Sequence, residues 1–249
     1  MSLEEFIANL TTKDLKLIKK EIEKVQEDSQ QHYRFSSIKD KDLKRLVDIE
    51  ESLDRTAFDE WFSYKVTLDE SIILFLEALI RDNELLIRSY KEEDLKIYFI
   101  SPLLNSINFK SFKYKVRGFY EAKIAYSTEK FSFSGTTDFL VSNGLLESKQ
   151  PLFFIQEFKK SEEFSNPRPQ LLAELISGVE LNNWRLIKGA YIVGSIWNFV
   201  ILEKLDKDKY QYFISQNFDS TKIGDLQDIY RHLLFIKNEI FSYLRELND

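Results

Sequence analysis

The chain has no cysteine, only two histidines, seven glycines and four prolines among its 249 residues. Without cysteine, neither a disulfide framework nor a thiolate metal site can form, which is typical of a reducing compartment. The shortage of glycine and proline favours long helices and regular strands over irregular loops. No apolar run approaches the roughly 20 residues that span a bilayer, and the N-terminal MSLEEFIANL is acidic where a secretory signal is basic. We therefore expect a soluble, cytoplasmic protein without membrane contact.

The chain also lacks an excess of positive charge, because its formal net charge is −6. General nucleic-acid binders are usually basic, so this balance argues against tight autonomous binding to DNA or RNA. A local basic cleft remains compatible with it, since a local field and a net charge are different quantities. The phosphate-binding patterns GxGxxG and GxxxxGK[ST] and the GxSxG elbow of serine hydrolases are missing too. Apolar residues make up 43% of the chain, with 21 phenylalanines, so one large domain or two small ones can form a core.

The first 88 residues have a helical texture. One helical stripe is formed by Leu15, Ile18, Ile22 and Val25. A second helix is expected from Asp42 to Leu53, after the polar connection SSIKDK. Thr67 with Glu70 suggests a capping box ahead of SIILFLEALI, which is apolar nearly all round and so expected to be buried. The sequence thus predicts a helical N-terminal region over residues 1–88.

From residue 89 to 249 the pattern becomes mixed. Ser89 with Glu92 suggests another capping box, opening a helix through EEDLKIYFI, with a break or restart at Ser101-Pro102. VRGFYEAKIAY and FSFSGTTDFLVS flank the polar STEK as a hairpin. A strand over 152–159, a helix from Pro169, the strands AYIVGS and WNFVILEKL, and a candidate third strand QYFISQNF follow. The last helix begins at Asp225 and carries Leu226, Ile229, Leu233, Ile236, Ile240 and Leu244 at helical spacing. This order predicts an α/β (mixed α+β) domain with helices on a central mixed sheet.

The stretch PLFFIQEFKK, residues 151–160, ends an apolar strand in full charges. Glu157 and Lys159 lie two apart and share one face of the strand. Burying such charges costs on the order of several kcal/mol per ion, unless the strand opens into a cleft that holds a cation. If the strand ending in FLVS pairs antiparallel with 152–159, Asp138 comes near Glu157. Two carboxylates and the Phe158 carbonyl would form an all-oxygen site suited to Mg²⁺ or Mn²⁺, beside Lys159.

The set Asp138, then 18 residues, then Glu157-Phe158-Lys159 resembles the PD-(D/E)XK, or restriction-endonuclease-like, nuclease superfamily. The superfamily's core order of helix, three antiparallel strands, helix and strand resembles the order expected here from about residue 89 to 200. Gly135 resembles its G-x-x-D approach to the acidic residue, although Thr137 stands where the family often has proline. The resemblance implies a metal held by Asp138, Glu157 and the Phe158 carbonyl. It also implies that Lys159 stabilises charge developing on phosphorus or helps to take a proton from water.

Two helices add further residues through the same resemblance. The helix running into FISPLLNSINF resembles the first core helix, which often supplies an acidic residue. Glu93 fits best because it shares a helical face with Ile97, Ile100 and Leu104, and Glu92 is the neighbouring alternative. The segment PQLLAEL resembles the Q-x-x-x-E/Y helix of some subfamilies, so Gln170 is expected to face the site, with Glu174 one turn on.

Structural interpretations remain open beside these assignments. Three E-x-K triplets occur, beginning at Glu121, Glu147 and Glu157, and only the last follows four apolar residues and precedes the Gln170 helix. Glu157 with Lys159 could form a surface ion pair worth roughly 0–1 kcal/mol. Asp138 could serve a turn, and the early helical acids could simply favour the helix dipole. Gln170 could instead lie on the surface, and the basic residues Lys160, Arg168 and Lys188 could either contact phosphate or be solvated. His32 and His232 have no partner at metal-ligand spacing, so surface or structural roles are expected for them. Trp61, Trp184 and Trp197 are expected in or near the core, with base stacking as an alternative for Trp184.

Three hypotheses about function follow. The first is a Mg²⁺- or Mn²⁺-dependent nuclease that hydrolyses phosphodiester bonds in DNA, with RNA as the other candidate substrate. The second is a catalytically silent nuclease-like module that recruits a protein partner through its N-terminal helices, and a homodimer is also open. The third is a helical scaffold with a purely structural sheet. The nuclease hypothesis requires the carboxyls of Asp138 and Glu157 to lie within one ion-bridging span, of order 8 Å, because metal–oxygen bonds are about 2 Å.

Overall fold

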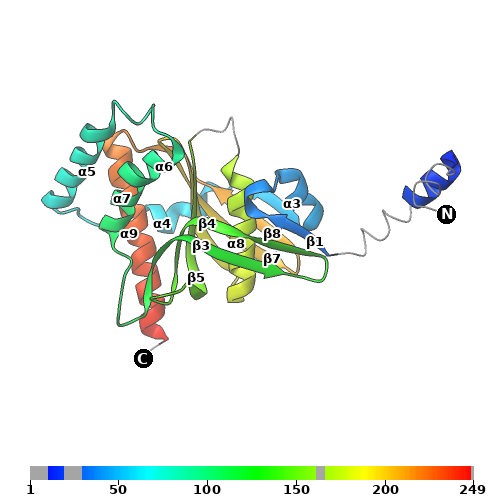
Figure 1. The fold of residues 1–249 in the computed structure, drawn as a ribbon. Coiled ribbons are helices and arrows are strands. Elements are labelled where there is room, and N and C mark those ends of the chain that lie inside the picture. The colour runs from blue at the N-terminus through cyan, green and yellow to red at the C-terminus, as the bar shows by residue number, and fades with distance from the viewer. Residues whose placement is uncertain (1–10, 20–29, 161–165, 248–249) are drawn as a thin grey trace.

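The centre of the protein is a mixed β-sheet, seen in a computed structural model that describes residues 11–19, 30–160 and 166–247 (Figure 1). Its main path runs β1-β4-β5-β6-β7-β8-β2, with β3 beside β4 and β9 beside β7. The strands are β1 (Gln31–Arg34), β2 (Asp48–Ser52), β3 (Val116–Ser127), β4 (Phe131–Asn143), β5 (Lys149–Lys159), β6 (Leu186–Val193), β7 (Ile196–Asp206), β8 (Lys209–Ile214) and β9 (Phe218–Asp219). The expected mixed α/β class is confirmed, and the nine-stranded sheet of the described residues removes the low strand content that would have supported the scaffold hypothesis.

The order of the strands explains how the middle of the sheet is assembled. Strands β3, β4 and β5 form an antiparallel meander, and the chain then crosses over through α8 (Pro167–Asn182) so that β6 pairs parallel with β5. Strands β6, β7 and β8 continue as antiparallel neighbours. The predicted hairpin around STEK and the predicted strand over 152–159 are therefore confirmed, and β5 lies in the interior of the sheet.

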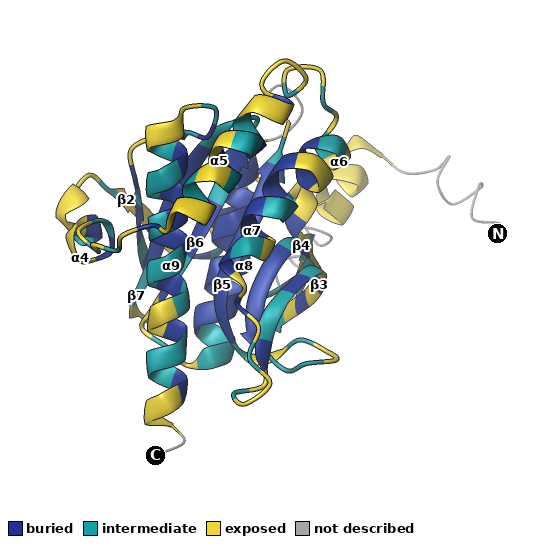
Figure 2. Ribbon diagram, turned by 90° about the vertical axis from the view of Figure 1, so that its left-hand side faces the viewer, coloured by how far each residue is buried: buried dark blue, intermediate teal, exposed yellow. Residues whose placement is uncertain are grey.

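Helices cover both faces of the sheet (Figures 1 and 2). One face carries α8 and α3 (Asp40–Leu46). The other carries α4 (Asp59–Phe62), α5 (Glu70–Asn83), α7 (Ser101–Ile107) and α9 (Ile223–Glu246), with the short α6 (Glu92–Leu95) near one end. A separate apolar core fills each interface, and the strands behind α7 and α9 are dark blue in Figure 2, which marks them as buried.

The two long helices differ because their surroundings differ. Helix α8 is buried from Pro167 to Val179 with the exception of Arg168, and its buried residues include the polar Gln170, Glu174 and Ser177. It begins two residues before the predicted Pro169, after the Asn166 side chain accepts a hydrogen bond from the Arg168 amide at 2.9 Å. Helix α9 is amphipathic, and all six of its predicted apolar positions are buried: Leu226, Ile229, Leu233, Ile236, Ile240 and Leu244.

The prediction of helix throughout the first 88 residues is wrong in two places. Residues 31–34 form β1, which pairs parallel with β4, and residues 48–52 form β2, which pairs parallel with β8. The helix predicted from Asp42 to Leu53 is instead α3, which ends at Leu46. Both strands are short edge strands whose hydrogen-bond partners lie far along the chain. The spacing of apolar residues within such short segments does not predict a strand. The division at residue 88 stays a prediction, although these strands join the same sheet as the later ones.

Two capping predictions are also wrong in detail. Helix α5 begins after Asp69 rather than Thr67, and α6 begins after Lys91 rather than Ser89. At α6 the Asp94 carboxylate accepts a hydrogen bond from the Lys91 amide at 3.0 Å. The predicted restart at Ser101 is confirmed: a π-helical turn, Lys96–Ile100, leads into α7 with Pro102 in its first turn.

The N-terminal stripe is described only in part. Leu15 and Ile18 lie in a helix over residues 12–19 and are exposed, whereas Ile22 and Val25 lie outside the described residues. Across the described part of the chain, none of the helices combines the length and the apolar character that a membrane crossing requires.

Candidate active site

The candidate site lies where β4 and β5 part. Their regular pairing ends with Phe139 opposite Gln156, so the next positions, Asp138 and Glu157, face each other at the opening. The Asp138 amide donates to Oε1 of Glu157 at 3.3 Å, and the Phe158 amide donates to Oδ2 of Asp138 at 2.9 Å. The predicted antiparallel register is therefore confirmed. At this point the backbone amides of the two strands donate to side-chain carboxylates instead of to backbone carbonyls of the opposite strand.

Lys159 lies at the centre of this opening. Its Nζ is 3.0 Å from the Phe158 carbonyl oxygen, 3.7 Å from Oε2 of Glu157 and 4.0 Å from Oδ2 of Asp138. The two carboxyl oxygens are separated by at most twice 4.0 Å, because both lie within that distance of one nitrogen. The span required by the nuclease hypothesis is met. The three oxygens that were expected to hold a metal converge on a single cation, here the ammonium group.

A second lysine, which sequence reasoning missed, lies on the other side of Asp138. Lys96, in the π-helical turn, is buried, and its Nζ is 3.8 Å from Oδ1 of Asp138 and 2.9 Å from Oε1 of Glu121. The ammonium also lies 5.8 Å from the centre of the Phe158 ring. Burial alone would lower the pKa of Lys96, but Glu121 and Asp138 raise it above its usual value, so the group stays charged.

Glu121 stands opposite Asp138 at an interruption of the β3–β4 ladder, and its φ of 54° is left-handed. A non-glycine residue in this conformation costs of order 1 kcal/mol or more, and such strain clusters at functional sites. The interruption turns the Glu121 carboxylate toward Lys96. Glu121, the acidic residue of the first E-x-K triplet, therefore belongs to the site through its ion pair with Lys96. The sequence around Glu121 did not indicate this role.

Helix α8 adds an acidic residue from the opposite side. Glu174 is fully buried, and it lies close enough to Glu157 for its carboxyl charge to raise the pKa of Glu157. Gln170, which is also buried, donates from Nε2 to Oε1 of Glu174 at 3.2 Å. The predicted orientation of Gln170 toward the site is therefore confirmed, with Glu174 between it and Glu157.

Burial dominates the electrostatics of this pair. It raises the pKa of Glu157 well above its ordinary value, and the neighbouring Glu174 and Asp138 raise it further. It also raises the pKa of Glu174 to about 8. Burial alone would lower the pKa of Lys159, but Glu157, Asp138 and Glu92 raise it above its usual value. At neutral pH the pair holds at least one proton, and the two lysines are charged.

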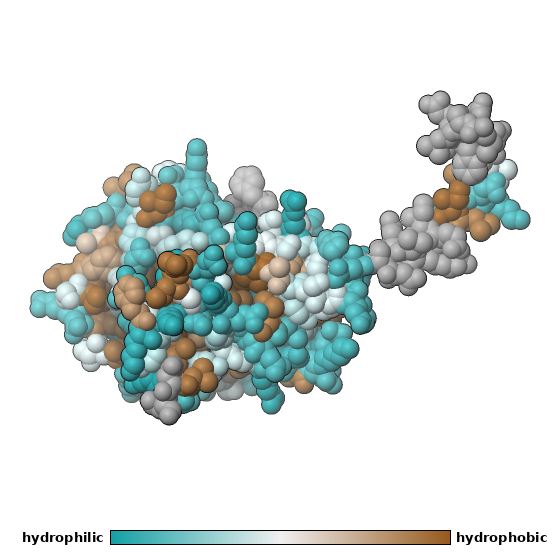
Figure 3. Space-filling model, turned by 60° about the horizontal axis from the view of Figure 1, so that its bottom comes forward, coloured by the Kyte–Doolittle hydropathy of each residue, from teal (hydrophilic) through white to brown (hydrophobic). Residues whose placement is uncertain are grey.

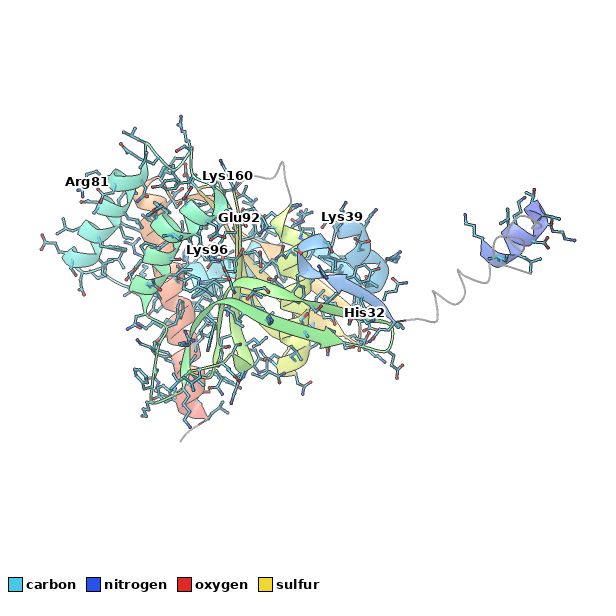
Figure 4. All side chains as sticks on the ribbon, in the orientation of Figure 1. His32, Lys39, Arg81, Glu92, Lys96 and Lys160 are labelled. Carbon is cyan, nitrogen blue, oxygen red and sulfur yellow. The ribbon has the colours of Figure 1, made fainter. Side chains whose placement is uncertain are left out.

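The first helix contributes Glu92 rather than Glu93. Oε1 of Glu92 lies 3.3 Å from Nζ of Lys159, and Figure 4 shows Glu92, Lys96 and Lys160 near one end of the sheet. Glu93, the residue preferred from the sequence, is exposed, and its charge acts on Lys96. The predicted face assumed α-helical spacing through Leu104. The π-helical turn changes that spacing, which leaves Ile97 exposed as well.

The remaining candidates lie elsewhere. Arg168 pairs with Asp40 at 3.0 Å, and Lys188 pairs with Glu239, so both have protein carboxylates as partners. Lys160 follows β5 and is exposed, His32 contacts the Ser132 hydroxyl, and His232 is buried against aromatic rings. Trp61 and Trp197 are core residues, and Trp184 packs between Phe153 and Tyr243.

The donor atoms suit a hard divalent ion in kind. Oε2 of Glu157 and Oε2 of Glu174 are buried without a hydrogen-bond partner in the described structure, and so have lone pairs to offer. Carboxylate and carbonyl oxygens are the ligands that Mg²⁺ takes in proteins. Among the described residues there is no ready-made group of three or more His, Asp or Glu side chains arranged around a metal position. Asp138, Glu157 and the Phe158 carbonyl thus make a partial set that water and substrate oxygens would complete, as is usual for Mg²⁺.

Comparison of the sequence with known protein families and with curated proteins found no match to either.

Proposed function

We propose that this protein is a Mg²⁺- or Mn²⁺-dependent nuclease with a restriction-endonuclease-like core, and that it hydrolyses phosphodiester bonds in DNA. The observation that carries the proposal is the convergence of three oxygens on one cation, Lys159, between 3.0 and 4.0 Å. The topology adds support, because an antiparallel meander, a crossover helix and a parallel strand follow the order that the PD-(D/E)XK resemblance implies.

In this proposal Asp138, Glu157 and the Phe158 carbonyl hold the ion. When bound, the ion would lower the pKa of a water molecule and polarise the phosphoryl group. Lys159 has a second anionic contact in Glu92 at 3.3 Å, so its ammonium keeps a partner when the ion takes the three oxygens. Lys159 then stabilises the negative charge that develops on the phosphoryl oxygens.

The surrounding residues have positioning roles. Lys96 holds Asp138 from the side away from Lys159, and the Phe158 amide fixes the other carboxyl oxygen. Glu174 accepts from Gln170, and its charge helps to raise the pKa of Glu157. Ion binding would require Glu157 to be deprotonated, so binding should release protons and tighten as pH rises.

One alternative has specific support. The pKa of Glu157 is raised, and the Lys159 ammonium lies at the centre of the three oxygens, so the negative charge of the site is balanced without a metal. The exposed apolar residues of the 12–19 helix, Leu15, Leu17 and Ile18, offer an apolar surface to a protein. A catalytically silent module that recruits a protein partner through its N-terminal helices fits these two features.

Cleavage assays separate the two proposals. Plasmid and single-stranded DNA are incubated with the full chain, with and without Mn²⁺, beside Asp138→Asn and Lys159→Met. The nuclease proposal expects Mn²⁺-dependent cleavage by the natural protein and losses of at least about a hundredfold in both variants, since electrostatic stabilisation of a transition state contributes that much. Lys123→Met, an exposed lysine on β3, is the matched control and should cleave normally.

Absence of cleavage, or equal cleavage by the natural protein and both variants, would reject the nuclease proposal. Calorimetry distinguishes the alternative, because the silent module should bind neither Mg²⁺ nor Mn²⁺ at this site. Thermal denaturation with Mn²⁺ gives the same answer independently, since an ion that binds only the folded chain raises its melting temperature.

A further inference from the structure

A basic segment lies between the first helix and the sheet. No acidic residue occurs between Asp94 and Glu121, in a chain whose net charge is −6. Within this interval the connection from α7 to β3 and the start of β3, residues 108–117, carry Lys110, Lys113, Lys115 and Arg117. We call residues 108–117 the basic arm. Its three lysines are exposed, and within the described structure none of its four basic side chains forms an ion pair with a carboxylate. Their charge is therefore available to an anion from outside.

Aromatic rings alternate with these charges. Phe112, at the tip of the arm, is 73% exposed, which is unusual for so large an apolar side chain. Nζ of Lys110 lies 5.6 Å from the centre of the Phe112 ring, and the Arg117 guanidinium lies 3.8 Å from that of Phe119. Cations interleaved with an exposed ring are typical of surfaces that bind single-stranded nucleic acids, where phosphates meet the cations and bases stack on the ring.

The arm is held in place by the rest of the protein. Ser111 and Val116 exchange backbone hydrogen bonds of 2.8 and 3.1 Å, and the Gly144 amide donates to the Lys115 carbonyl at 2.6 Å. Tyr114 packs against Phe241 of α9 with ring centres 6.2 Å apart. Phe112 is thus presented by an anchored turn, so binding would carry little entropic cost for ordering it. Figure 3, in which the bottom of the molecule comes forward, shows hydrophilic and hydrophobic side chains interspersed across this face.

A polar hollow of about 280 Å³ lies beside the arm, and its walls include Asn105, Asn108, Lys110, Arg117, Tyr120 and Phe139. Of these residues, Tyr120 lies close enough to Lys96 for the ammonium charge to act on its hydroxyl, so the hollow approaches the side of the site that Lys96 occupies. Strand β3 pairs only with β4 in the described sheet, which leaves its other edge beside the hollow unpaired. From Arg117 to Glu121 the strand rises about 13 Å.

From this continuity we propose that the basic arm binds single-stranded nucleic acid and leads it along the edge of β3 into the Asp138–Glu157 site. Lys110, Lys113 and Arg117 contact phosphates, and a base stacks on Phe112. The position of this track beside the site rests on the proposed nuclease function, whereas the binding itself does not. The preference for a single strand follows from Phe112, because its ring can stack only on an unpaired base.

Binding is tested without metal, so that cleavage does not interfere. Fluorescence anisotropy with a short labelled oligothymidylate in EDTA is measured over a range of salt concentrations. For Lys110→Gln/Lys113→Gln we expect weaker binding and a log–log salt slope that is shallower by about 1.4, since each single-strand phosphate contact contributes about 0.7. Phe112→Ala should bind about fivefold more weakly or worse with an unchanged slope. Lys41→Gln/Lys44→Gln, two exposed lysines of α3, is the charge-matched control and should behave like the natural protein.

Three results would overturn the proposal: no binding by the natural protein, an equal loss in the arm pair and the α3 pair, or a loss in Phe112→Ala for a duplex as large as for the single strand. Asp138→Asn separates this proposal from the nuclease proposal. If the natural protein and Asp138→Asn both bind through the basic arm but no cleavage occurs, the proposal that the arm binds single strands holds and the nuclease proposal fails. If the natural protein cleaves DNA and the arm variants bind and cleave as it does, the nuclease proposal stands and the track fails.

Discussion

Replacing Glu174 by glutamine should make the protein more stable at alkaline pH and flatten the pH dependence of its unfolding free energy. Glu174 is fully buried beside Glu157, and burial raises the pKa of both carboxyls, so the folded chain keeps a proton that the unfolded chain releases. Glutamine has nearly the same shape. Its amide can donate to the Glu157 carboxylate, and its oxygen can still accept from Gln170, which now donates to Glu174 at 3.2 Å.

The magnitude follows from linkage. The pKa of Glu174 rises from the 4.5 of a free side chain to about 8 in the folded protein. Between these values the folded state binds more protons than the unfolded state, so stability is greatest at the acid end and falls as pH rises, by up to about 1.4 kcal/mol per pH unit. By pH 8 the cost is at most about 4 kcal/mol. Glu174→Gln should recover a large part of it at pH 8 and change stability little at pH 5. Glu157 keeps a raised pKa of its own, so some slope will remain.

The assay is urea unfolding followed by tryptophan fluorescence in EDTA, from pH 5 to pH 9, for the natural protein and the variant. Glu129→Gln, in the exposed turn between β3 and β4, is the matched control and should reproduce the natural pH profile. If Glu174→Gln has the same pH profile as the natural protein, Glu174 does not hold a proton in the folded chain at neutral pH and the electrostatic account of the site is wrong.

Two other predictions concern the charges of Lys96 and His232. Lys96→Met removes a cation 3.8 Å from Asp138 while keeping the aliphatic stem, so calorimetry should give at least several-fold tighter Mn²⁺ binding. Unchanged or weaker binding would show that repulsion between Lys96 and the ion does not limit its affinity. Burial lowers the pKa of His232 to about 4, so the folded state excludes a proton that the unfolded state binds, and stability should fall as pH drops from 6.5 toward 4, by up to about 3 kcal/mol. His232→Phe, whose ring can keep the stacking on Phe62 at 4.0 Å, should remove this loss, and an unchanged acid profile in urea unfolding would refute the assignment.

The part of the site predicted from the sequence is the part that lies on regular strands. Alternation along a strand puts Glu157 and Lys159 on one face, and antiparallel pairing of β4 with β5, on which the prediction was conditional, brings Asp138 opposite Glu157. Glu92, Lys96 and Glu121 could not be chosen in the same way. Their placement depends on a π-helical turn and on an interruption of the β3–β4 ladder, both local departures from regular spacing that periodicity does not encode. An uninterrupted absence of acids from 95 to 120 was visible in the sequence, but nothing in it said that this segment adjoins the site.

The mixed α/β class, the long amphipathic helix at the C-terminus and the charged end of a buried strand follow from the sequence alone, because these are set by the spacing of apolar residues over a few turns or strand positions. The packing of distant segments makes β1 and β2 extend the sheet, buries Glu174 beside Glu157, and brings Lys96 to Asp138 and Glu92 to Lys159. Those outcomes depend on hydrogen-bond partners and burial supplied by segments distant in the chain. Spacing along the chain specifies which side of an element a residue occupies, whereas the identity of its neighbour depends on how the elements pack.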